Sequence, residues 1–234
     1  MKKEAWILNL NTVTYHEALE LQKKLVELRS RDSIQDTLIL LEHPPVFTIT
    51  GEATRRNLLA SPQALAEKGI TVHQTNRGGD ITYHGPGQLV GYPIISLKDR
   101  GKDLHRYIRS LEEMIILVLQ EYGIRGYRDA INAGVWVEGD KIAAIGIAVK
   151  SSWTTMHGFA FNISPDLSHY SFIVPCGIVG RGVTSLAKIL GRQVERKEVQ
   201  NRLVHYFEEV FEVSSKEVSL DHIQNEKCKV KNET

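Results

Sequence analysis

Cysteine is scarce in this 234-residue chain, which contains only Cys176 and Cys228. Two cysteines so far apart in sequence do not form the disulfide framework that stabilises many small secreted domains. Their scarcity is typical of proteins from a reducing compartment, and it favours a cytoplasmic location.

Long apolar runs are absent as well. The longest apolar stretch, residues 142–149, is far shorter than the ~20 residues that a membrane-spanning helix needs. The first nine residues carry positive charge but no sustained apolar segment, which argues against a signal peptide. We therefore expect no membrane association.

Neither sign of charge is in excess. The 29 Lys and Arg residues nearly balance the 28 Asp and Glu residues, so the net charge is +1. This balance gives no electrostatic reason to expect binding to nucleic acid, although a local basic group such as Arg55, Arg56 and Arg77 could contact an acidic partner. No set of His, Cys and Asp residues has the spacing of a zinc site, so we predict no metal site.

The overall amino-acid composition is typical of one globular domain. Hydrophobic residues make up 42% of the chain and charged residues 24%, which is enough apolar material for a core. No linker divides the sequence. We predict a single domain over residues 1–220, followed by a polar, disordered tail over residues 221–234.

Hydrophobic periodicity predicts both helices and strands. Thr14 and Glu17 have capping-box spacing, and apolar residues follow at helical intervals. Further helices are predicted from Ser61 and over residues 104–122 and 194–213. Strands are predicted over residues 6–10, 37–41, 46–50, 89–95, 134–137, 141–149 and 159–163, and around Val72. Because hairpins alternate with helical segments, we predict an α+β fold with a mixed, mostly antiparallel sheet flanked by helices.

Residues 77–89, with the sequence RGGDITYHGPGQL, form the first of four segments that indicate function. Their glycines allow the backbone to approach a ligand closely, and the polar side chains between them supply hydrogen-bond donors. Neither nucleotide-binding glycine pattern is present. A glycine-rich surface turn is the simpler interpretation, but the density of polar residues favours a ligand-binding loop.

The second segment is the strand that begins at Lys141. A lysine beside a hairpin turn is usually a solvated charge. A functional role requires that Lys141 face a cavity, in which case Ala143, Ala144 and Gly146 would leave space for a substrate.

The third segment begins with His157 and Gly158. Three interpretations of His157 are open. We favour a structural turn residue first, a hydrogen-bonding residue in the wall of a site second, and a catalytic base third.

The fourth segment places Cys176 between Pro175 and Gly177. A lone cysteine is most often a small core residue, but flanking proline and glycine favour a rigid, exposed turn. A cysteine nucleophile requires a nearby cation or base that lowers the pKa of its thiol. Lys141, His84 and His157 are the candidates for that group, and Cys228 in the polar tail is the poorer nucleophile.

Together and in this order, the four segments resemble the lipoyl(octanoyl) transferase family. Residues 77–88 follow the pattern R-G-G-x-x-T-Y-H-G-P-G-Q at every fixed position. Residues 141–146 resemble the family's lysine strand, residues 157–162 its H-G-x-A-x-N segment, and residues 175–177 its nucleophile turn. The resemblance covers the globular chain from the first strand past Leu186.

This resemblance implies the fold of biotin and lipoate protein ligases and a monomer that needs no cofactor. It implies transfer of an octanoyl group from octanoyl-acyl carrier protein to a lysine of lipoyl domains, which occur on 2-oxoacid dehydrogenases and the glycine cleavage H protein. Cys176 would be the nucleophile, and Lys141 would lower the pKa of its thiol and relay protons. The substrate site would be lined by Arg77, Gly78, Gly79, Asp80, Ile81, Thr82, Tyr83, His84, Ala144, Ile145, Gly146, Gly158, Phe159 and Ala160.

Both half-reactions of such a transfer pass through an oxyanion, which needs hydrogen-bond donors. The backbone N–H groups of residues 78–79 or 176–177 are candidates.

Three functions compete with octanoyl transfer as interpretations of the sequence. An ATP-dependent lipoate–protein ligase would not need Cys176, a binding module would show no turnover, and a cysteine thioesterase would use water in place of the lysine.

Overall fold

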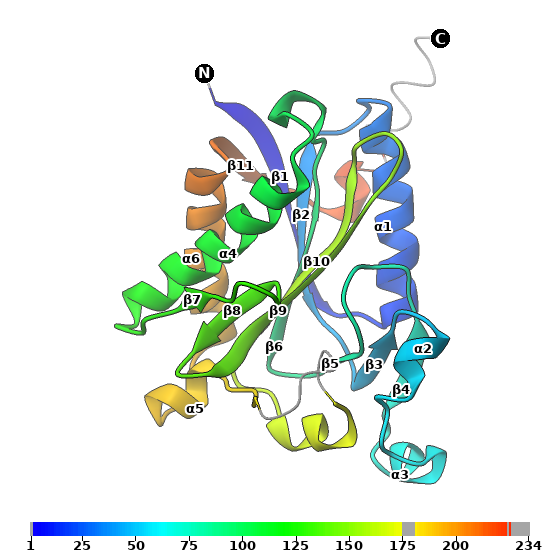
Figure 1. The fold of residues 1–234 in the computed structure, drawn as a ribbon. Coiled ribbons are helices and arrows are strands. Elements are labelled where there is room, and N and C mark those ends of the chain that lie inside the picture. Colours follow the sequence, from blue (N-terminus) through cyan, green and yellow to red (C-terminus); the bar gives the residue numbers. More distant parts are fainter. Residues whose placement is uncertain (1, 175–180, 224, 226–234) are drawn as a thin grey trace.

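The computed structural model describes residues 2–174, 181–223 and 225, and its centre is one long mixed sheet (Figure 1). The sheet has eight strands in the order β11 (Val213–Glu217), β1 (Lys3–Thr12), β2 (Asp36–Glu42), β6 (Gln88–Ile94), β10 (Thr155–Asn162), β9 (Asp140–Val149), β8 (Gly134–Val137) and β7 (Tyr127–Arg128). Strand β1 pairs in parallel with β11 and β2, and all other neighbours are antiparallel. The predicted α+β class is therefore confirmed.

Helices cover both faces of this sheet. In Figure 1, α4 (Leu104–Glu121) and α6 (Arg196–Val210) lie on one side, and α1 (Tyr15–Ser30) lies on the other. Strand β2 shows the consequence, because Leu38 and Leu40 pack in the α4–α6 core while Ile39 and Leu41 pack in the α1 core. A strand buried on both faces is continuously apolar, which is why this one was visible in the sequence.

A second, smaller sheet lies beside the lower end of α1 in Figure 1. Its three strands are β4 (Thr71–Gln74), β3 (Val46–Ile49) and β5 (Thr82–His84), with α2 (Glu52–Arg55) and α3 (Pro62–Glu67) in the connections. Strand β5 was not predicted, because it is a three-residue strand inside the glycine-rich segment. The remaining elements are the 3-10 helices η1 (Lys98–Arg100) and η2 (Leu167–Phe172) and the short helix α5 (Leu186–Leu190).

Local sequence determines how several of these elements begin and end. The predicted capping box at the start of α1 is present, with reciprocal hydrogen bonds between Thr14 and Glu17. The predicted hairpin joins β8 to β9 through Glu138 and Gly139, which have φ angles of 50° and 94°. Positive φ at both central residues is the conformation that two-residue hairpins favour.

The C-terminal part of the chain differs from its prediction in two places. The helix predicted to reach Val213 ends at Val210, because Val213 instead begins β11 at the edge of the sheet. Residues 220–223 are helical, and Ile223 packs in the α1 core with 2% of its surface exposed. The folded domain therefore extends beyond the predicted boundary at residue 220.

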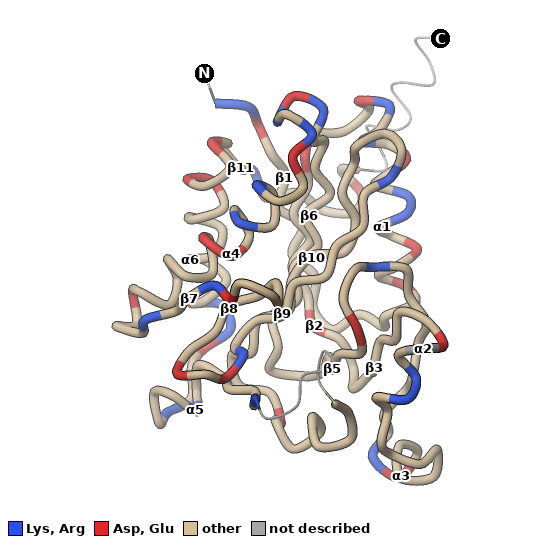
Figure 2. The backbone as a smooth tube through the Cα atoms, viewed as in Figure 1, with Lys and Arg blue, Asp and Glu red and all other residues tan. Residues whose placement is uncertain are grey.

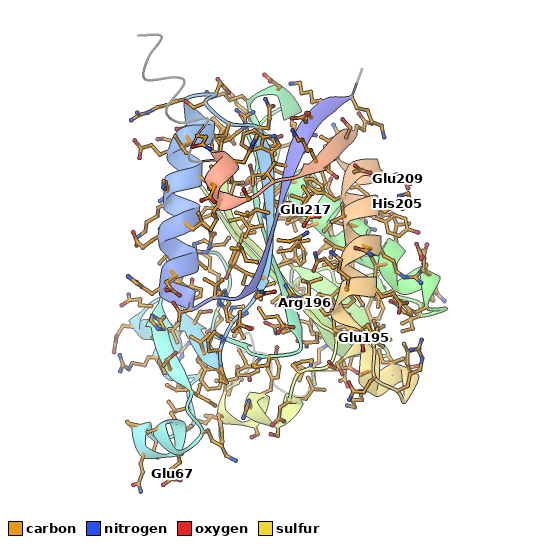
Figure 3. The ribbon with its side chains drawn as sticks, turned by 180° about the vertical axis from the view of Figure 1, so that it is seen from behind. Glu67, Glu195, Arg196, His205, Glu209 and Glu217 are labelled. Carbon is orange, nitrogen blue, oxygen red and sulfur yellow. The ribbon has the colours of Figure 1, made fainter. Side chains whose placement is uncertain are left out.

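The outer surface is polar and of mixed charge. Figure 2 shows Lys and Arg on the same elements as Asp and Glu, in keeping with the near-zero net charge. The outer face of α6 is an example, on which Figure 3 labels the exposed residues His205 and Glu209. Within the described ranges, no helix combines the length and the hydropathy that crossing a bilayer requires.

Candidate functional site

A cavity of about 340 Å³ lies where β9 and β10 face the segment between β4 and β5. Ile108 of α4 and the connection between β7 and β8 complete its wall. Three of the four segments singled out in the sequence therefore meet at one place. The fourth, with Cys176, lies in residues 175–180, outside the described part of the chain.

Most of the predicted site residues line this cavity. They are Arg77, Gly78, Gly79, Asp80, Ile81, Thr82, His84, Lys141, Ala144, Ile145, Gly146, Gly158, Phe159 and Ala160. Tyr83 is different, because successive side chains of a strand point to opposite faces. Its ring packs against Phe47 in the core of the small sheet, and its hydroxyl is 2.8 Å from His169 Nδ1. Tyr83 therefore supports the site from behind and does not line it.

Lys141 is almost completely buried, with 7% of its surface exposed. Its ammonium nitrogen is 3.4 Å from the carbonyl oxygen of Ala133 and 4.8 Å from the centre of the Trp136 ring. The Lys141 backbone pairs with the segment 182–184, donating to the Gly182 carbonyl and accepting from the Thr184 N–H, both at 3.0 Å. Lys141 is thus a cation held inside the cavity wall and not a solvated surface charge.

Arg77 organises the loop in which it lies. Its guanidinium donates to the hydroxyl of Thr48 at 2.9 Å and to the carbonyls of Asp80 at 2.7 Å and Gly78 at 3.0 Å. These bonds hold the loop against β3. The loop also lies directly on β9, because a Cβ atom at Gly146 would be 2.8 Å from the Gly78 carbonyl oxygen.

This packing bears on the predicted oxyanion donors. The N–H of Gly78 donates to the carbonyl of Ile147 on β9 at 2.8 Å. A hydrogen bond inside the protein removes this N–H from the donors available to a reacting oxygen, so the Gly78 part of that prediction is wrong. Residues 176 and 177, the alternative pair, lie outside the described residues.

Three buried histidines lie in the cavity wall or next to it, and burial disfavours the charged form of all three. His84 and His157 line the cavity, and His43 lies behind Tyr92, whose hydroxyl is 2.7 Å from His43 Nε2. Burial lowers the pKa of His43 and of His157 to about 4, and it lowers the pKa of His84 well below its ordinary value. The nearby Arg77 further lowers the pKa of His84 and His157.

These shifts predict loss of stability in mild acid. The unfolded chain titrates its histidines near pH 6.5, whereas folded His43 and His157 titrate near pH 4. Between these values the unfolded state binds more protons, so this contribution is complete above pH 6.5 and is lost as the pH falls towards 4. At pH 5 we expect a loss on the order of 1–2 kcal/mol from each residue, measured by urea unfolding at pH 7.5 and pH 5.

Substitution at His43 separates this effect from the titration of carboxylates. His43→Gln should make the unfolding free energy less dependent on pH than in the wild type, while the exposed His16→Gln should not. Equal dependence on pH in all three proteins would contradict the assignment.

The sequence analysis missed several residues of the cavity wall. They are Tyr15, Tyr92, Ile108, Ile131, Asn132, Ala133 and Ile147. Tyr92 gave a usable signal, since it is a polar-tipped residue in an otherwise apolar strand. Tyr15 and Ile131 gave none, because only the folded chain brings the start of α1 and the connection between β7 and β8 to the cavity.

Nowhere in the described residues do three His, Cys, Asp or Glu side chains group as they would around a metal ion.

Comparison with known proteins places this site in a family. Residues 14–208 match the model of the lipoyl protein ligase A/B catalytic domain. An octanoyltransferase from Caldicellulosiruptor saccharolyticus is 49% identical over 217 residues, which cover 92% of each chain. An octanoyltransferase from Rubrobacter xylanophilus is 52% identical over 198 residues, which cover 84% of this chain and 88% of that protein.

Solved structures show the same fold at low identity. The structure of lipoate-protein ligase A bound with ATP superposes with a TM-score of 0.75 at 16% identity, covering 98% of this chain and 94% of that chain. Biotin protein ligase from Aquifex aeolicus gives 0.51 at 14% identity, with 91% and 70% covered. The chain thus has the fold shared by lipoate and biotin protein ligases. The chain belongs to the lipoyl protein ligase A/B catalytic domain family, and the resemblance predicted from its motifs is confirmed.

Proposed function

We propose that this acyltransferase moves an octanoyl group from octanoyl-acyl carrier protein to a lysine of a lipoyl domain, through a thioester on Cys176. The main support is the 44–52% identity to proteins named octanoyltransferase over most of the chain. The cavity adds a buried lysine beside an apolar slot, which is the arrangement that a cysteine acyl-transfer reaction needs.

The described residues on both sides of Cys176 lie near the cavity. Val174 donates its N–H to the Asn57 carbonyl at 2.8 Å, and the Asn57 side chain donates to Asp80 of the cavity wall at 2.7 Å. On the other side, Arg181 stacks on Trp136, 3.7 Å from the ring centre, next to Lys141.

The proposed reaction has two balanced steps. The Cys176 thiolate attacks the donor thioester, a new C–S bond forms, and the carrier leaves as a thiol after taking a proton. The lysine amine of the lipoyl domain then attacks the acyl-enzyme, an amide forms, and the proton that the amine loses restores the Cys176 thiol. Lys141 is the proposed proton relay, and no ATP is required because each step consumes a thioester.

Intact-protein mass spectrometry tests the nucleophile. Wild type, Cys176→Ala and Cys228→Ala are incubated with octanoyl-acyl carrier protein without an acceptor. We expect one hydroxylamine-labile octanoyl group on wild type and on Cys228→Ala, and none on Cys176→Ala. Addition of a lipoyl domain should then remove the group from the enzyme. Octanoylation of the lipoyl domain that requires ATP and survives Cys176→Ala would instead identify a ligase.

A further inference from the structure

Two amide side chains at the ends of sequence motifs have no part in the function proposed above. Gln88 closes the glycine-rich segment and Asn162 closes the segment that begins at His157. Both are buried, with 0% and 3% of their surface exposed. They belong to one hydrogen-bonded chain that runs behind the cavity wall from Thr184 to His84.

The direction of this chain follows from its end at a backbone carbonyl. The Thr184 carbonyl can only accept, so the group 3.0 Å from it must be the amide nitrogen of Asn162. The Asn162 oxygen therefore faces Gln88 and accepts from its amide nitrogen at 2.9 Å. The same Gln88 nitrogen lies 3.2 Å from the carbonyl of Tyr83, a second group that can only accept.

The orientation of Gln88 determines the protonation of His84. With its nitrogen facing Asn162, Gln88 presents its oxygen to His84 Nδ1 at 2.8 Å. An amide oxygen is only an acceptor, so Nδ1 must carry the hydrogen. The His84 ring is neutral, because burial and the neighbouring His43 and Arg77 disfavour a second proton. Its Nε2 is then a free lone pair.

This lone pair belongs to a residue of the cavity wall. His84 lines the cavity, and its Nε2 has no hydrogen-bond partner among the residues that the structure describes. His157 differs in this respect. Its Nε2 is 3.2 Å from the side-chain oxygen of Asn76, a solvent-exposed residue that no further described hydrogen bond orients. The His84 tautomer is therefore fixed by the fold, whereas that of His157 is not.

We propose that Gln88 and Asn162 are positioning residues that hold His84 as the Nδ1–H tautomer, so that His84 Nε2 accepts a hydrogen bond from the amine of the incoming lysine. The proposal rests on the function proposed above. A weakly basic imidazole orients the amine, whose lone pair must point at the thioester carbonyl, without removing its proton. Removal of that proton is assigned to Lys141. The hydrogen-bonded series that includes Asn162 and Gln88 also reaches the strand of Lys141, because the Thr184 N–H donates to the Lys141 carbonyl.

The tautomer can be measured directly on the full-length protein. Two-dimensional NMR of ¹⁵N-labelled imidazole rings distinguishes a protonated Nδ1 from a protonated Nε2. We expect the His84 signals of the wild type to show Nδ1–H between pH 6 and pH 8, and those of Gln88→Met to show loss of this single state. Gln200→Met is the matched control, because Gln200 is also buried, with 5% exposed, and its side chain donates to Asn9, which does not line the cavity.

Single-turnover kinetics test the role in the reaction. Acyl-enzyme is formed first, and its discharge to a lipoyl domain is then followed. Gln88→Met and His84→Leu should slow discharge about tenfold more than they slow acylation, the usual effect of one hydrogen bond lost in a single step. His84→Gln should recover most of the rate, since its amide oxygen supplies an acceptor near the place of Nε2. Gln200→Met should behave as wild type.

The outcomes separate this proposal from the function on which it rests. An Nε2–H or doubly protonated His84 in the wild type would overturn the proposal, as would normal discharge by Gln88→Met or His84→Leu. A wild type that never becomes acylated would overturn the proposed function, and the NMR signals of His84 would still decide its tautomer.

Discussion

Replacement of Lys141 by methionine is expected to lower kcat/KM for octanoyl transfer by about 10²–10⁴-fold, the usual range for loss of a proton-transfer group. Methionine is an unbranched apolar side chain of similar length, and it lacks the ammonium group that lies over the Trp136 ring. The fold should therefore be retained, and steady-state kinetics with octanoyl-acyl carrier protein and a lipoyl domain would measure the loss.

A second lysine near β9 provides the control for this experiment. Lys150 directly follows β9, the strand that contains Lys141, but it is exposed and does not line the cavity. Lys150→Met should leave kcat/KM unchanged. If Lys141→Met kept most of the wild-type activity in a folded protein, Lys141 would have no role in proton transfer.

The second large effect concerns the length of the acyl chain. Ala160 on β10 and Ala144 on β9 are paired in register, and both line the cavity. Leucine at position 160 adds three carbons to the slot and should displace about three methylene groups of the substrate. At ~0.8 kcal/mol for each, octanoyl transfer should lose roughly 2–3 kcal/mol, or about 60-fold in kcat/KM, while shorter chains should lose much less.

The measurement is the ratio of kcat/KM for octanoyl, hexanoyl and butyryl donors. Ala144→Leu fills the slot from the neighbouring strand and should shift this ratio in the same direction, so that a packing defect in one variant cannot explain both results. Ala66→Leu, on the exposed surface of α3, should not change it. An unchanged ratio in both cavity variants would mean that the acyl chain does not bind against these two alanines.

Most of the central sheet could be predicted because its strands carry local signals. The hairpin of β8 and β9 needs only a turn sequence between two apolar runs, and β2 is visible as a continuous apolar run. Strand β11 carries no such signal. Its five residues include two serines, a lysine and a glutamate, and it exists because β1 offers it a free edge to pair with.

The candidate site was predictable to a similar extent, and for a similar reason. The types of residue that line the cavity follow from the motifs, since glycines, a lysine and histidines occur there in unusual density. The sequence did not indicate that Tyr83 turns away from the cavity while its neighbour Thr82 lines it. That difference depends on the direction of a three-residue strand, which is set by its pairing with β3.

By itself, the sequence determined the helical and strand periods, the turn at Gly139, the capping box at Thr14 and the family, because each depends on residues close together in the chain. Only the tertiary structure decided which nitrogen of His84 carries the proton. That choice depends on Asn162 and Thr184, which lie far along the chain and are linked to His84 through Gln88 only when β10 pairs with β6. Short-range order follows from local conformational preference, whereas the protonation of a buried ring depends on the partners that folding brings to it.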